Sequence, residues 1–152
     1  KGEPEAVLAQ LVEMRGRIAS AKAPAGPWDA KLGPGRLMEL ELIAQAGTLM
    51  AGQAARDVAS GFDGGVAIGW LDDADRDALA RAYAICWQVQ MVARLISDKP
   101  LDPALMGEGG AAFLLRETGQ QDLAKLEACL KDVSKTAAGV IDAALERLPK
   151  KV

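Results

Sequence analysis

The chain has 152 residues, of which 18 are Lys or Arg, 21 are Asp or Glu and none is His, so its net charge is −3 at neutral pH. Because a Ser-His-Asp or Cys-His relay, a His-ligated zinc and a carboxylate-histidine di-iron site each need an imidazole, the sequence excludes all of them. The acidic balance argues against a general affinity for nucleic acid or for anionic membranes, since binding to those surfaces needs an excess of Lys and Arg.

Helical periodicity begins at Pro4, where apolar residues spaced three and four apart predict a helix that ends near Ala21. The segment 23–34 then holds three prolines and two glycines, which rules out a helix or a central strand. This segment is therefore predicted to be an exposed loop.

A second helix is predicted from residue 35 to about residue 51, and it is apolar almost all round, as is typical of a helix surrounded by protein. Its polar residues fall on two sides of the helix. Glu41, Gln45 and Thr48 form one narrow polar stripe, whereas Glu39 stands on a different side.

The middle of the chain contains many glycines. Residues 53–59 are predicted to form a short helix, followed by a glycine-rich turn at 60–65 and a brief apolar link at 66–70. Asp72 then has the character of an N-cap, with Asp75 at the third helical position in a carboxylate variant of the capping box.

The helix that this cap opens is predicted to be long and to close at residues 97–100. Beyond it, Asp102 and Pro103 predict a short turn of helix, and the glycines of residues 107–110 predict an interruption. A further helical segment is predicted at 111–117, with Gly119 as its C-terminal cap.

The last helix carries the clearest periodicity, from Leu123 until Pro149 stops it, and no segment alternates like a strand. We therefore predict an all-α fold, an antiparallel up-and-down helical bundle with short connecting helices. A single domain is expected over residues 1–152, composed of a lead-in helix (1–21), a Pro/Gly loop (22–36) and the bundle (37–149). Because the chain opens without Met, we expect it to be a fragment of a longer protein.

Two features bear on the cellular compartment. Cys86 and Cys129 lie far apart within apolar helical patterns and are predicted to be reduced core thiols. No apolar run approaches the ~20 residues that a membrane span needs. A cytoplasmic location without membrane contact is the expectation.

The polar residues of the second helix and of the loop before it are the candidates for a site. Glu39 and Glu41 point ~200° apart on a helix and cannot share a metal ion. Glu41 with Gln45 is compatible either with contact to a partner or ligand or with a solvated stripe. The loop of residues 33–36, preceded by Lys31, is compatible with a phosphate site at a helix N-terminus or with a plain helix-initiating turn.

Other candidates have simpler interpretations. The acidic run of residues 72–77 resembles a metal cluster in composition only, and helix capping is the favoured interpretation. Tyr83, Trp87 and Met91 are interpreted as core or interface packing. Trp28 is compatible with packing on its own domain or with a contact to sequence outside the chain.

One series of motifs runs through residues 12–18 (VEMRGRI), 29–31 (DAK) and 33–45 (GPGRLMELELIAQ). It resembles the helical domain that follows a nucleotidyltransferase domain in glutamine synthetase adenylyltransferases. In that family a Met-Arg helix precedes a loop with Asp, a hydrophobic residue and Lys, and then Gly-Gly-hydrophobic-x-Asp-Ile-Glu-Phe-hydrophobic-x-Gln. The likeness continues more loosely through residues 69–83 and into the last helices.

The chain departs from the family pattern at three positions: Arg36 stands for a glycine, Glu39 for Asp and Leu42 for Phe. The polar character after Tyr83 is also lost. The resemblance nominates Lys31, Gly35, Glu41 and Gln45, and Glu39 in part, as contacts with a substrate or a neighbouring domain. Arg36 joins these candidates as the second cation of the loop.

The resemblance also implies how the activity is divided. The family's active site, which uses ATP and Mg²⁺, lies on a separate domain with an Asp-x-Asp signature that this chain lacks. The chain itself is therefore expected to hold no catalytic residue and to bind neither metal nor cofactor. The implied partners are the adjacent nucleotidyltransferase domain, glutamine synthetase and PII protein, and the C-terminal copy of the helical domain is favoured.

Two alternatives stay open. The helical domain of a PII uridylyltransferase carries a similar motif. A free-standing helical interaction module would use the same polar stripe to bind a partner helix.

Overall fold

A computed structural model describes residues 1–150 of the chain. These residues form a bundle of six α-helices without a strand, which confirms the predicted all-α class. The helices are α1 (Pro4–Ala21), α2 (Leu37–Ala51), α3 (Val58–Ala67), α4 (Asp73–Ile96), α5 (Gly107–Thr118) and α6 (Leu123–Leu145).

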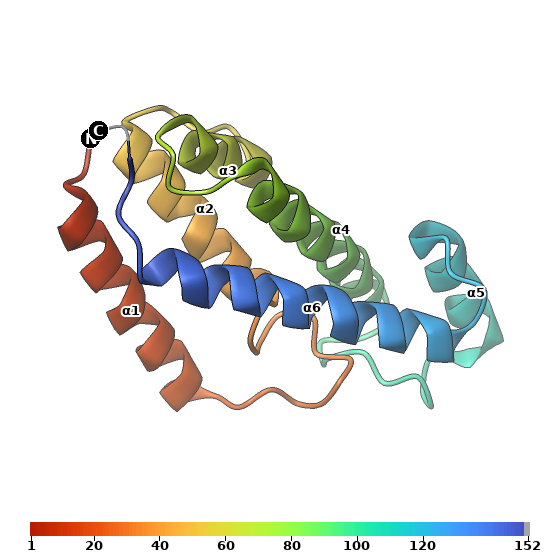
Figure 1. The fold of residues 1–152 in the computed structure, drawn as a ribbon. Coiled ribbons are helices and arrows are strands. Elements are labelled where there is room, and N and C mark those ends of the chain that lie inside the picture. Colours follow the sequence, from red (N-terminus) through yellow and green to blue (C-terminus); the bar gives the residue numbers. More distant parts are fainter. Residues whose placement is uncertain (151–152) are drawn as a thin grey trace.

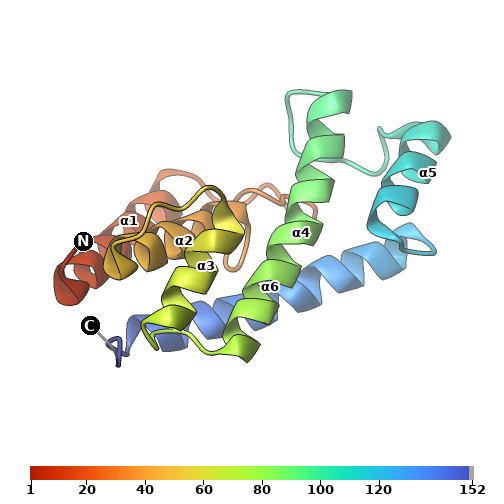
Figure 2. The same ribbon diagram turned by 90° about the horizontal axis from the view of Figure 1, so that it is seen from above.

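The two longest helices, α4 and α6, pack against each other and form the axis of the bundle. Helices α1, α2 and α3 gather around one end of this pair, and α5 lies at the other end against α4 and α6 (Figures 1 and 2). Each end has its own cluster of buried side chains. The first is centred on α2 with Leu40, Ile43 and Phe62, and the second lies between α4, α5 and α6 with Leu114 and Leu130.

The glycine-rich residues 60–65, predicted as a turn, lie inside helix α3, and residues 53–57 are not helical. The prediction was wrong because α3 packs unusually closely on α2. A Cβ on Gly47 would come within 2.3 Å of the Gly61 carbonyl oxygen, and one on Gly61 within 2.4 Å of the Ala44 carbonyl oxygen. Tertiary packing of two glycine faces therefore outweighs the low helix propensity of glycine.

A second correction concerns residues 107–110, which were predicted to interrupt the chain but form the first turn of α5. This helix packs on the bundle through Leu114, which is fully buried, and the packing again outweighs propensity. Residues 103–105 form a turn rather than helix. The predicted cap Gly119 is confirmed, with φ of 69° in the left-handed region.

The end of the last helix also differs from the prediction. Helix α6 ends at Leu145, before Pro149. A residue that precedes a proline is biased away from the helical region, so the helix stops upstream of the proline. The Trp70 indole donates a hydrogen bond to the Ala144 carbonyl oxygen (2.9 Å) and so satisfies an acceptor in this last turn.

Neither cysteine forms a disulfide in the part of the chain that the structure describes: Cys86 is buried and Cys129 is half-buried. No helix within residues 1–150 is both long enough and apolar enough to cross a membrane.

Candidate functional site

The loop between α1 and α2 is organised by Asp29. Its carboxylate, which is buried, accepts hydrogen bonds from the backbone N–H groups of Ala25 (3.0 Å), Lys31 (3.1 Å) and Leu32 (3.1 Å). Such a side-chain-to-backbone arrangement fixes the turn in one conformation. The side chain of Lys31 is thereby held at an exposed position on the surface of the loop.

Trp28 anchors the same loop to the bundle. Its ring is buried in the second cluster, and its indole nitrogen donates to a Glu127 carboxylate oxygen on α6 (3.2 Å). Of the two interpretations of Trp28, the structure therefore supports packing on its own domain.

The backbone N–H groups at the start of α2 are all engaged by acceptors within the chain. The Gly35 N–H donates to the Glu39 carboxylate (2.9 Å). The next three N–H groups donate to backbone carbonyl oxygens: Arg36 to Gly33 (3.2 Å), Leu37 to Ala30 (3.0 Å) and Met38 to Lys31 (3.1 Å). A phosphate at a helix N-terminus is bound by free N–H groups. Because residues 35–38 have none left, the contacts favour the plain helix-initiating turn over the phosphate site.

Glu39 joins three segments of the chain. One carboxylate oxygen accepts the Gly35 N–H, and the other accepts Nε of Arg15 on α1 (2.9 Å). Arg15 also contacts Asp142 on α6, with 3.2 Å between nitrogen and oxygen. Glu39 therefore links α2 to the loop and to α1, and Arg15 extends this link to α6. The divergence of the Glu39 side chain from Glu41 is as the helical spacing predicts.

Gly35 lies where the loop approaches α6 most closely. Its φ is 67°, and a Cβ built on it would stand 2.0 Å from the carbonyl oxygen of Ser134. Only glycine fits this position, because any side chain would collide with backbone atoms and would also force an unfavourable left-handed conformation.

Arg36 lies inside the bundle rather than on its surface. Its side chain is buried, and one terminal nitrogen has no hydrogen-bond partner among the described residues. Burial lowers the pKa of Arg36, and the nearby Cys86 and Asp29 partly offset this effect. The structure thus separates Arg36 from Lys31, the other cation of the loop.

Lys31 borders a hollow of about 670 Å³ between the loop, the end of α1 and the end of α4. We call this hollow the basic cleft, after four exposed cations that line it: Lys22, Lys31, Arg94 and Lys99. None of the four forms an ion pair within residues 1–150.

Glu41 and Gln45 lie together at a separate hollow of about 510 Å³, where Thr48 of α2 and residues 55–58 also contribute. Both side chains are exposed. Burial raises the pKa of Tyr83 on α4, and the carboxylates of Glu41 and Asp57 add to the effect. The polar stripe of α2 is thus open to a partner but does not meet Lys31.

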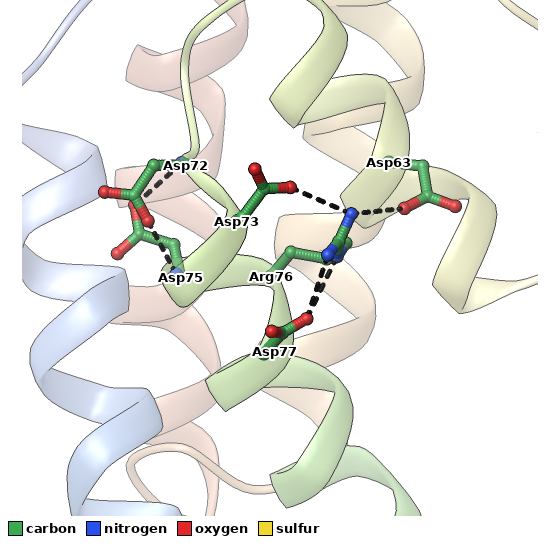
Figure 3. A network of polar contacts seen from close by, with 6 residues as sticks. All are labelled: Asp63, Asp72, Asp73, Asp75, Arg76 and Asp77. Carbon is green, nitrogen blue, oxygen red and sulfur yellow. Dashed lines mark hydrogen bonds and ion pairs between the residues drawn. The ribbon is translucent and has the colours of Figure 1, made fainter.

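The acidic run is used for capping and ion pairing (Figure 3). Asp75 donates its backbone N–H to the Asp72 carboxylate (2.8 Å), and Asp72 donates to Asp75 (3.1 Å), which is the predicted capping box. Arg76 pairs with Asp73 and Asp77, at 3.0 Å each. Among the described residues, no group of three or more His, Cys, Asp or Glu is arranged to hold a metal ion.

Sequence reasoning did not find three of the cleft's cations: Lys22, Arg94 and Lys99. They come from separate segments, and no local pattern shows that these meet at Lys31. It also gave no role to Arg15 or Asp29, although both belong to the motifs that carried the resemblance.

Comparisons with known proteins agree with that resemblance. Residues 5–145 match a family model described as GlnD PII-uridylyltransferase. The bifunctional glutamine synthetase adenylyltransferase/adenylyl-removing enzyme of Rhizobium meliloti (strain 1021) is 31% identical over 169 residues, covering 94% of this chain and 17% of the relative. The enzymes of the same name from Mesorhizobium japonicum and Bartonella quintana are 30% and 26% identical, each covering 84% of this chain and 13% of the relative. The chain thus spans less than a fifth of the length of these relatives.

Proposed function

Because the chain belongs to the family that the GlnD PII-uridylyltransferase model describes, we propose that it is a non-catalytic helical domain supporting an adjacent nucleotidyltransferase domain. The curated relatives are bifunctional glutamine synthetase adenylyltransferases/adenylyl-removing enzymes. In this proposal the longer protein attaches AMP to glutamine synthetase and removes it, and ATP and Mg²⁺ are bound by the adjacent domain rather than by this chain.

The observation that supports the proposal is that the matched motifs contain two kinds of residue, one held in contacts within the chain and one with exposed side chains. Arg15, Asp29, Gly35 and Glu39 hold the loop and the start of α2 in place through buried or half-buried contacts. Lys31, Glu41 and Gln45 leave their side chains exposed. Residues that are held rigidly in position and remain exposed are suited to contact a neighbouring domain or its substrate.

The experiment uses the longer protein that carries this chain. Lys31→Ala and Glu41→Ala are each expected to slow AMP transfer to glutamine synthetase by about tenfold, since each removes one exposed charge from an interface. Lys131→Ala on α6, which is also an exposed lysine, serves as the control and should leave the rate unchanged. Unchanged rates for both Lys31→Ala and Glu41→Ala would refute the assigned contacts.

The name of the matching family model supports one alternative, in which the longer protein transfers a uridylyl group to PII protein instead of an adenylyl group to glutamine synthetase. The two functions are distinguished by incubating the same longer protein either with glutamine synthetase and ATP or with PII protein and UTP. Labelling of glutamine synthetase is expected, and labelling of PII protein alone would assign the chain to the alternative.

A further inference from the structure

The basic cleft adjoins a second hollow, and together they form a trough along one side of the bundle. The second hollow, of about 900 Å³, lies between residues 25–29 of the first loop and residues 97–105, which follow α4. Both hollows are lined by Asp29, Ala93 and residues 97–100. The two loops run near each other below α6 in Figure 1.

The trough combines cations with apolar side chains. Ile96 and Leu105, which are 41% and 78% exposed, line the larger hollow, and the buried side chains of Trp28 and Leu101 lie beneath them. An exposed apolar lining beside charged residues is typical of surfaces that bind another polypeptide.

The charge of the trough is opposite to that of the chain. Its two hollows together are lined by four cations, Lys22, Lys31, Arg94 and Lys99, against three carboxylates, Asp29, Asp98 and Asp102, which gives a local balance of +1 in a chain of net charge −3. The carboxylate of Asp29 is already engaged by backbone N–H groups. Cations are favoured at helix C-termini, which accounts for Lys22 and Arg94 but not for the loop residues Lys31 and Lys99.

The local backbone argues against a phosphate group as the occupant. Phosphate sites use free backbone N–H groups in loops and at helix starts. Here the N–H groups of Ala25, Lys31 and Leu32 bind Asp29, and those of residues 35–38 bind acceptors within the chain.

We propose that the trough binds an acidic polypeptide segment whose apolar side chains enter the larger hollow while its carboxylates pair with the cations of the basic cleft. This inference goes beyond the proposed function, because it concerns binding by the chain itself and needs no transfer reaction.

The test uses a fluorescently labelled peptide in which Glu alternates with Leu and Phe, and a second peptide with Lys at every Glu position. Binding to the chain is measured by anisotropy at low and at moderate salt. The Glu peptide is expected to bind, more weakly as salt screens the exposed charges, and the Lys peptide is not. ATP with Mg²⁺ and tripolyphosphate, at the concentration of the peptide, should not displace it.

The decisive variant carries Arg94→Glu and Lys99→Glu, which leaves Lys31 and therefore the proposed function untouched. It should weaken binding of the Glu peptide by about tenfold or more. The control carries Lys131→Glu and Lys135→Glu on α6, has the same net charge and should bind within about twofold of the unmodified chain. Melting temperatures verify that both variants are folded.

Three results would overturn the inference. These are no binding of the Glu peptide, equal weakening by the two double variants, and displacement of the peptide by tripolyphosphate. The last result would assign the trough to phosphate ligands instead.

Discussion

Glu39 and Arg15 show how single side chains hold the loop region together. The pair is partly buried, with 15% and 21% of the two side chains exposed, and it connects α1 to the start of α2. Helical spacing shows that Glu39 does not share a face with Glu41, but it cannot show that Glu39 pairs with Arg15 on another helix. Sequence therefore predicts which residues form the motifs, and the fold reveals that they bind one another.

A double-mutant cycle tests this pair. Arg15→Ala and Glu39→Ala should each lower the free energy of unfolding by about 1–3 kcal/mol, because each leaves a partly buried charge without its partner. The coupling energy should exceed that of the exposed pair Arg17 and Glu13, for which a few tenths of a kcal/mol is usual. Urea unfolding measures both cycles, and equal couplings would contradict the structural role of Glu39.

Gly35 offers a sharper test, because the chain provides a matched control. Gly35 and Gly119 have φ of 67° and 69°, yet a Cβ on Gly119 would meet no atom within 4 Å. Gly119→Ala should lower the free energy of unfolding by about 1 kcal/mol, because alanine is less favourable than glycine in the left-handed conformation. Gly35→Ala should cost more than about 2 kcal/mol, because it also collides with Ser134. If urea unfolding gave similar decreases in the free energy of unfolding for the two variants, the close approach of Gly35 to α6 would not be important.

At the scale of elements, the periodicity of apolar residues predicts the long helices α1, α2, α4 and α6, and the capping residues predict where several of them begin or end. The glycine-rich segments were mispredicted because helix propensity is a local property. In α3 the glycines serve contact with α2, and only the tertiary structure shows the partner.

Two helical glycines distinguish packing from propensity. A Cβ on Gly61 would lie 2.4 Å from the Ala44 carbonyl oxygen, whereas one on Gly139 of α6 has open space around it. Gly61→Ala should therefore destabilise the chain by about 1–3 kcal/mol. Gly139→Ala should stabilise it by about 0.5–1 kcal/mol through helix propensity. Thermal unfolding measures whether each variant is destabilised or stabilised, and stabilisation by Gly61→Ala would contradict the close α2–α3 contact.

At the scale of the whole molecule, charge is separated along α4. Its first turn carries Asp73 and Asp75, and its last turn leads into the basic cleft with Arg94 and Lys99. The net charge of −3 predicts no general affinity for nucleic acid, and it gives no sign that cations from distant segments gather in one place. The sequence indicates Lys31, Glu41 and Gln45 as candidates, but the basic cleft could be located only once the helices were assembled.

The central claim is that this chain supports a nucleotidyltransferase domain through its exposed motif residues. The most direct measurement is the rate of AMP transfer to glutamine synthetase by that domain, prepared separately, with and without this chain added. We predict that the unmodified chain raises the rate and that a chain carrying Lys31→Ala and Glu41→Ala does not. A nucleotidyltransferase domain that works equally fast with the unmodified chain, with the variant chain and alone would contradict the claim.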